Sequence, residues 1–115
     1  MEKHTSGWTI DEYVTEAGEN LVLSFLSALT GKMKAEAIAL LKLLQERGNI
    51  LRMPHSKPLG DGLFELRGNQ VRIFYIFRPG RRITLLDGMV KKRDRIPTKI
   101  LNRARRLQKE IEANI

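Results

Sequence analysis

Hydrophobic residues along this chain recur at two different spacings, and the change of spacing divides the sequence into a helical part and a strand part. Apolar residues return every three or four positions over about 21–29 and again over about 32–47, the spacing of amphipathic helices. Thr30-Gly31 separates the two runs, and Gly48-Asn49 follows the second as a C-terminal helix signal. We expect these two helices to form a helical hairpin that packs on a core.

The second half of the chain has the short spacing of strands. Apolar and β-branched residues fill 63–68, 71–77 and 82–90, and Pro79-Gly80 marks a turn between the last two runs. Residues 50–62 contain two prolines and two glycines and are expected to form a loop. Trp8-Thr9-Ile10 is a candidate for a short first strand.

A third helix is predicted to begin near Pro97, a residue favoured in the first turn. It has an apolar face made of Ile100, Leu101, Ala104, Leu107 and Ile111. Since the strands follow one another in the chain, we expect an α+β fold: a small antiparallel-dominated sheet packed against the N-terminal helical hairpin, with a C-terminal helix. The length of 115 residues predicts one domain over 1–115.

The alternation within 63–68 and 71–77 predicts how these two strands pair. If Asn69-Gln70 is a two-residue turn, Arg67 lies opposite Arg72 and Glu65 opposite Phe74. A three-residue turn would bury an arginine. The two-residue turn gathers on one face a set of apolar and aromatic residues that belongs against the helices: Phe64, Leu66, Val71, Ile73, Tyr75 and Phe77.

The other face then carries two arginines in opposed positions, which destabilises a sheet unless an anion binds them or an acid separates them. Glu65 lies two residues from Arg67 on the same face and is a candidate for that acid. Arginine suits phosphate because its planar fork binds two oxygens and stays charged. Arg72 is the first candidate to contact a phosphate, and Arg67 is the second. The alternative is that both are structural ion-pair partners.

Positive charge is concentrated in the second half of the chain. The formal net charge is +8, and from Arg67 to Lys109 there are 14 Lys or Arg residues against only Asp87 and Asp94. This distribution favours nucleic acid as the partner over an anionic membrane or none. The candidates for contacting a nucleic-acid backbone, each of which could instead be a solvated surface residue, are Lys91, Lys92, Arg93, Arg95, Arg103 and Arg106.

Other kinds of chemistry have little support. The chain has no cysteine, and its two histidines, His4 and His55, lack nearby carboxylates at ligand spacing, so we expect no metal site and no cofactor. His55, before the sheet, either transfers protons near neutral pH or is incidental. No apolar run approaches the roughly 18 residues of a membrane span, and no secretory signal is recognisable. We therefore expect no membrane partner and a cytoplasmic location.

Residues 57–107 resemble the RelE/ParE toxin superfamily, specifically its HigB-like, phage-derived (Gp49-like) branch. The segments that carry the resemblance are Lys57-Pro58-Leu59, Gly62-Leu63-Phe64-Glu65-Leu66-Arg67, Val71-Arg72-Ile73-Phe74-Tyr75, Val90-Lys91-Lys92, Pro97 and the helix that contains Ala104. The resemblance implies a RelE-like fold and the toxin of a type II toxin–antitoxin system. It also implies a metal-independent, ribosome-associated mRNA endoribonuclease that inhibits translation, with the ribosome, mRNA and a helix-turn-helix antitoxin as partners.

The match to the family's motifs places the catalytic candidates at its basic functional positions: Arg67, Arg72, Lys91 and Lys92. The substrate-binding candidates are Glu65, His55, Arg93, Arg95, Arg103 and Arg106. Several family enzymes have a histidine or an aromatic acid–base residue in the C-terminal segment, whereas residues 93–115 here contain no His and no Tyr. The general base is therefore not identified.

Two other functions remain open. A ParE-like toxin that inhibits DNA gyrase would have the same fold without nuclease activity. An inactive phage-derived nucleic-acid-binding protein would use the basic half of the chain alone. A nuclease would need Arg67, Arg72 and the lysines to converge in one concave pocket.

Overall fold

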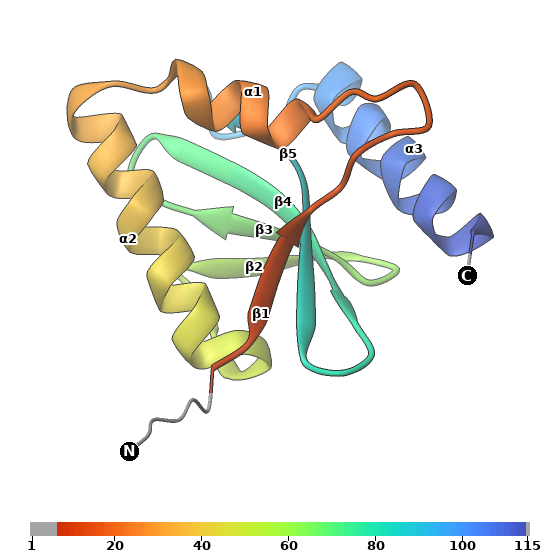
Figure 1. Cartoon of the computed structure of the whole chain (residues 1–115). Helices are drawn as coiled ribbons and strands as arrows, with labels where there is room; N and C mark the ends of the chain where they lie inside the picture. Colours follow the sequence, from red (N-terminus) through yellow and green to blue (C-terminus); the bar gives the residue numbers. More distant parts are fainter. Residues whose placement is uncertain (1–6, 115) are drawn as a thin grey trace.

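Five strands form one sheet in the order β1-β5-β4-β3-β2 (Figure 1). The computed structural model describes residues 7–114. The strands are β1 (Thr9–Glu12), β2 (Ser56–Gly60), β3 (Leu63–Arg67), β4 (Val71–Arg78) and β5 (Arg82–Val90). β1 runs parallel to β5, and the other neighbours are antiparallel. The expected α+β class with a mostly antiparallel sheet is confirmed, as is the short first strand.

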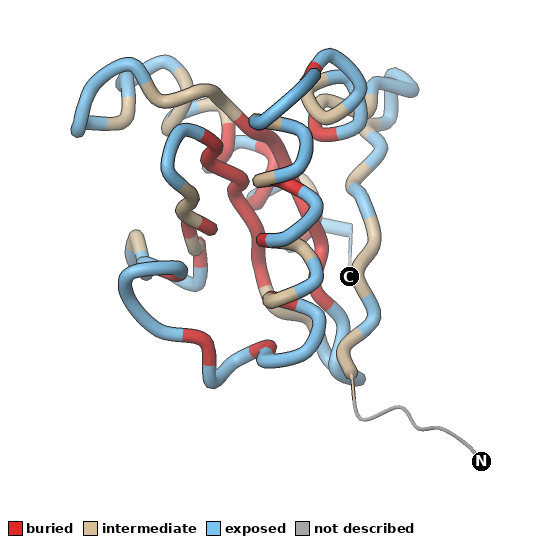
Figure 2. Tube along the Cα trace, turned by 90° about the vertical axis from the view of Figure 1, so that its left-hand side faces the viewer, coloured by how far each residue is buried: buried red, intermediate tan, exposed pale blue. Residues whose placement is uncertain are grey.

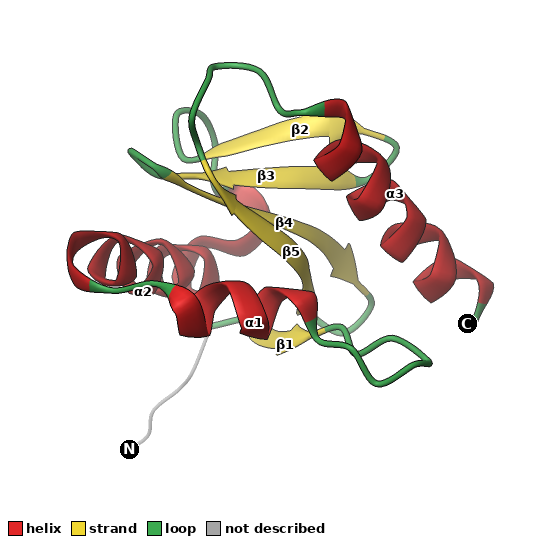
Figure 3. Cartoon of the chain, turned by 90° about the horizontal axis from the view of Figure 1, so that it is seen from above, coloured by secondary structure: helices red, strands yellow, loops and turns green. Residues whose placement is uncertain are grey.

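Helices lie on both faces of this sheet (Figure 3). They are α1 (Leu21–Ala28), α2 (Gly31–Arg47), which continues into the 3-10 turn η1 (Gly48–Ile50), and α3 (Thr98–Ala113). The expected pair of N-terminal helices is present, but α2 leaves α1 at a corner rather than folding back along it (Figure 1). Leu29 and Thr30 between them are both extended, and this conformation redirects the chain. In residues 7–114 no helix is long and apolar enough to cross a membrane.

The predicted register of the β3–β4 hairpin is confirmed. Arg67 pairs with Arg72 and Glu65 with Phe74, and the Gly68 N–H donates to the Val71 carbonyl across the two-residue turn. The predicted apolar face packs against α1 and α2 as one core cluster with Val22, Leu40 and Leu44. Figure 2 shows buried segments gathered in the middle of the molecule, between the helices.

The opposite face of the sheet is partly covered by α3. Leu63, Phe74 and Ile76 form a second core cluster there with Ala104, Leu107 and Ile111 of this helix. Arg105 donates to the carbonyls of Leu59 and Gly60, and the buried Gln108 donates to that of Asp61. These bonds hold α3 against the β2–β3 turn. Arg67 and Arg72 lie at the other end of β3 and β4.

The expectation that residues 50–62 are a loop was wrong for 56–60, which form β2. Pro58 interrupted the strand pattern in the sequence, because a proline cannot donate a ladder hydrogen bond. In the sheet order β2 is an edge strand that pairs with β3, and a proline is tolerated at such an edge. A strand therefore lies beside the segment that carries Glu65 and Arg67.

The fully buried Tyr75 hydroxyl lies 2.6 Å from Ser56 Oγ, and burial raises the pKa of Tyr75. Above the unfolded tyrosine pKa of about 10 the folded state retains the proton that the unfolded state loses, so stability falls as pH rises further. We expect the urea midpoint of the wild type to drop above about pH 10 by more than that of Tyr75→Phe. Because both proteins share their lysines, equal slopes would contradict this prediction.

Candidate functional site

Three charged side chains meet on the α3 side of the sheet, at the end of the β3–β4 hairpin. Arg67 Nε lies 3.4 Å from Glu65 Oε1, and Arg72 Nε lies 3.7 Å from Glu65 Oε2. Glu65 is 4% exposed. One buried carboxylate therefore lies between the two opposed arginines and offsets their repulsion.

The two arginines differ in what their guanidinium groups can still bind. Arg72 Nη1 donates to the carbonyls of Gly68 and Val71, and only 6% of the side chain is exposed. Burial lowers the pKa of Arg72, whereas the charge of Glu65 acts in the opposite direction. The Arg67 side chain is 24% exposed, and its Nη1 contacts Met53 Sδ at 3.9 Å. Arg67 is thus the more accessible of the pair, whereas the sequence favoured Arg72 as the first contact with phosphate.

The cations that follow β5 form a neighbouring group in the segment 91–97. Lys91 Nζ lies 3.2 Å from Asp94 Oδ1, and the Lys91 N–H donates to the Gln70 carbonyl at 2.6 Å. Three further cations of this segment line a cavity of about 150 Å³ together with Met89, Val90 and Pro97: Lys92, Arg93 and Arg95.

These two groups are adjacent, and neither Arg67 nor Arg72 lines the cavity of the second group. Met89 is the cross-strand partner of Arg72, and the charge of Asp94 acts on the Arg72 guanidinium. The segment 91–97 therefore lies beside the arginine pair, and Lys92, but not Lys91, lines its cavity.

Two residues of the β2 segment lie beside the arginine pair. The exposed His55 accepts a hydrogen bond from the Arg67 N–H through its carbonyl oxygen, at 2.7 Å. Lys57 is exposed and is the cross-strand partner of Glu65. We missed Lys57 as a candidate because its strand was taken for a loop. The signal available was its place in Lys57-Pro58-Leu59, one of the segments that carry the family resemblance.

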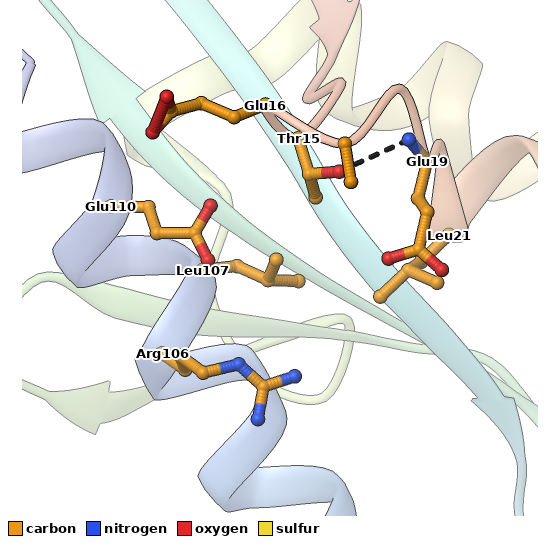
Figure 4. Close-up of a pocket in the computed structure, with 8 residues that line it drawn as sticks. Thr15, Glu16, Glu19, Leu21, Arg106, Leu107 and Glu110 are labelled. Carbon is orange, nitrogen blue, oxygen red and sulfur yellow. Dashed lines mark hydrogen bonds between the residues drawn. The ribbon is translucent and has the colours of Figure 1, made fainter.

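The two arginine candidates on α3 have acidic surroundings. Arg103 Nε lies 2.6 Å from Asp87 Oδ2, and Asp87 is 1% exposed. Arg106 lines a separate cavity of about 410 Å³ with Glu16, Glu19 and Glu110 (Figure 4). In the structure these arginines contact or face carboxylates rather than joining Arg67.

For residues 7–114, no group of three or more His, Asp or Glu side chains is arranged to hold a metal ion. His4, the other histidine considered as a metal ligand, lies outside the described residues.

The arrangement of the sheet and its helices is a RelE-like fold. One chain of the crystal structure of the toxin–antitoxin complex RelBE2 from Mycobacterium tuberculosis superimposes with a TM-score of 0.55 at 17% identity, covering 74% of this chain and 99% of that chain. No curated protein matches the sequence. The chain belongs to the family of phage-derived Gp49-like proteins, whose family model matches residues 24–109. The Gp49-like family recognised from the motifs is confirmed, and so is the RelE-like fold.

Proposed function

We propose that this protein is the toxin of a type II toxin–antitoxin pair and that it cleaves ribosome-bound mRNA without a metal ion. The observation that carries the proposal is the pair of opposed arginines around the buried Glu65 carboxylate, with Arg67 still accessible. The structural neighbour belongs to a toxin–antitoxin complex, which supports an antitoxin partner. The helix-turn-helix character of that antitoxin, the ribosome and mRNA as partners, and a cytoplasmic location are parts of the same proposal.

The proposed reaction needs little apparatus. The RNA 2′-oxygen bonds to the adjacent phosphorus while the bond from phosphorus to the 5′-oxygen breaks, which leaves a 2′,3′-cyclic phosphate and a 5′-hydroxyl. Arg67 would bind the phosphate oxygens through its exposed guanidinium edge, where negative charge grows in the transition state. Arg72 holds the hairpin turn and Glu65 beneath it, so it would act mainly by positioning.

The proton from the 2′-hydroxyl must go to a base, and the leaving 5′-oxygen must gain a proton. We assign the first transfer to His55, because its backbone bonds to that of Arg67 and an imidazole can accept a proton. Lys91 or Lys92 on the neighbouring segment would protonate the leaving group. Lys57, opposite Glu65, would add a contact to the RNA backbone.

One observation favours a second candidate, a ParE-like toxin that inhibits DNA gyrase. Lys92, Arg93 and Arg95 line their own cavity, and Arg72 is committed to the protein's own carbonyls. The cations are therefore not all directed into one pocket, as a nuclease would require in the simplest case.

The test is tightly induced expression in a bacterial culture, with primer extension on a reporter mRNA and analysis of the new RNA ends. We expect growth arrest, discrete cuts in the reading frame and 2′,3′-cyclic phosphate ends. Arg67→Gln should abolish arrest and cuts together, because a donor of this kind supplies about 3 kcal/mol to the transition state. Arg47→Gln, an exposed arginine on α2, removes the same charge and should change neither.

The alternatives predict other results. Arrest without cuts would contradict the nuclease and support inhibition of gyrase. A folded protein that causes no arrest would contradict both toxin functions and support an inactive nucleic-acid-binding protein.

A further inference from the structure

The β3–β4 turn receives a carboxylate from a helix more than thirty positions earlier in the chain. Glu36 of α2 accepts hydrogen bonds through one oxygen, Oε2, from the Gln70 N–H at 2.8 Å and from the Val71 N–H at 2.7 Å. Both bonds join the N-terminal helices to the tip of the hairpin that carries Arg67 and Arg72.

The carbonyl groups of the same turn accept hydrogen bonds from two of the cationic residues, Arg72 and Lys91. Arg72 Nη1 donates to Gly68 O and Val71 O, and the Lys91 N–H donates to Gln70 O. The N–H groups of the turn therefore bind the Glu36 carboxylate. Its carbonyl groups bind Arg72 and Lys91, which belong to the two segments that supply the cations.

The contact between α2 and the turn is close. A Cβ atom built on Gly68 would lie 2.2 Å from Glu36 Oε2 and 2.8 Å from Leu40 Cδ1, so any side chain at this position would displace Glu36 and Leu40 from their present places. Leu40 is buried in the core. The helix thus fixes both the place of the carboxylate and the place of the turn.

We propose that Glu36 is a positioning residue of the phosphate-binding site, because it fixes the turn from which Arg72 and Lys91 are held and beside which Arg67 projects. This inference rests on the proposed RNA-cleaving function. Glu36 does not contact the phosphate. It acts on the geometry of the arginines, and a displacement of about 1 Å at such a site can cost as much as a hundredfold in rate.

The variants Glu36→Ala and Glu36→Gln separate positioning from a general loss of stability. Alanine leaves the two N–H groups without an acceptor, whereas the glutamine side chain keeps an oxygen that can accept both bonds. We expect Glu36→Ala to lower kcat by about tenfold or more and to raise KM by about fivefold, and we expect Glu36→Gln to stay within about threefold of wild type in both. Glu46→Ala, the same change at an exposed position of α2, is the matched control.

Two further readouts follow the turn and the site without catalysis. Hydrogen exchange at the Gln70 and Val71 amides should speed up in Glu36→Ala and not in Glu46→Ala. The affinity for a short 2′-O-methyl RNA, which binds but cannot be cleaved, should weaken by about fivefold or more in Glu36→Ala.

The outcomes distinguish this inference from the proposed function. If the wild type cleaves and Glu36→Ala cleaves equally well, the positioning role is wrong and the nuclease stands. If Glu36→Gln loses as much activity as Glu36→Ala, the acceptor geometry is not what matters, and the inference is again wrong. If the wild type does not cleave, the proposed function fails, and unchanged affinity of Glu36→Ala for the 2′-O-methyl RNA overturns the inference separately.

Discussion

Replacing Arg72 with methionine is expected to lower the stability of the fold and to remove RNA cleavage together. Methionine leaves Glu65, which is 4% exposed, with Arg67 at 3.4 Å as its remaining ion-pair partner. The carbonyls of Gly68 and Val71 also lose their guanidinium donor. Breaking a buried ion pair of this kind costs about 3 kcal/mol. The arginine that looked like the catalytic group is thus expected to be a structural one as well.

The same substitution at Arg67 is the matched control, and it should separate the two effects. A partly exposed ion pair contributes at most about 1 kcal/mol, so Arg67→Met should unfold near the wild-type urea midpoint. Cleavage should still fall by about a hundredfold or more, since the exposed phosphate contact is lost. Urea denaturation and the cleavage assay on both variants provide the comparison. Equal losses of stability at the two positions would contradict the assignment.

Replacing Asp87 with alanine is expected to cost about 3 kcal/mol or more of the free energy of unfolding. Asp87 is 1% exposed, and its carboxylate accepts from Arg103 Nε at 2.6 Å and from the Gly88 N–H at 2.8 Å. Alanine leaves the guanidinium of Arg103 partly buried without its partner and frees α3 from β5. Both losses weaken the cover over the second core cluster.

Urea denaturation tests this prediction against a second carboxylate substitution. Asp94→Ala removes the exposed partner of Lys91, and we expect no measurable change in its urea midpoint. A midpoint for Asp87→Ala as high as that of Asp94→Ala would show that the Asp87–Arg103 pair does not stabilise the fold. It would also return Arg103 to the group of residues available to RNA.

The hairpin register could be predicted from the sequence because a one-residue shift exchanges the two faces of a strand. With Phe64, Leu66 and Tyr75 on one face, only one pairing kept the arginines off the face that packs against α1 and α2. The same register placed Phe74 and Ile76 on the other face, which already required a cover for them. The sequence predicted the apolar face of α3 but not where this helix packs. It therefore could not predict that α3 covers Phe74 and Ile76.

The parts of the site that could not be predicted depend on contacts between distant segments. Arg72 is less accessible than Arg67 because its guanidinium donates to two backbone carbonyls of the turn. The periodicity of the side chains does not predict such bonds to the backbone. The extra residue in β5 opposite Phe74 and Tyr75 sets the register in which Asp87 is buried. Glu36 reaches the turn from a helix, and no local pattern marks it.

The two edge strands of the sheet, β1 and β2, determine how readily this protein can pair with other copies of itself. An edge strand with free backbone groups invites pairing with another chain, and short strands, prolines and charged residues discourage it. β2 is five residues long and carries Lys57 and Pro58, and β1 is four residues long and ends in Asp11 and Glu12.

Between these edges, β5 carries Ile83, Leu85 and Leu86, all nearly inaccessible to solvent. Without β1 beside it, the nine-residue strand β5 would be an edge of the sheet. The residues matched by the family model begin at position 24, after β1. By pairing with β5, the short N-terminal strand occupies backbone groups that another chain could otherwise bind.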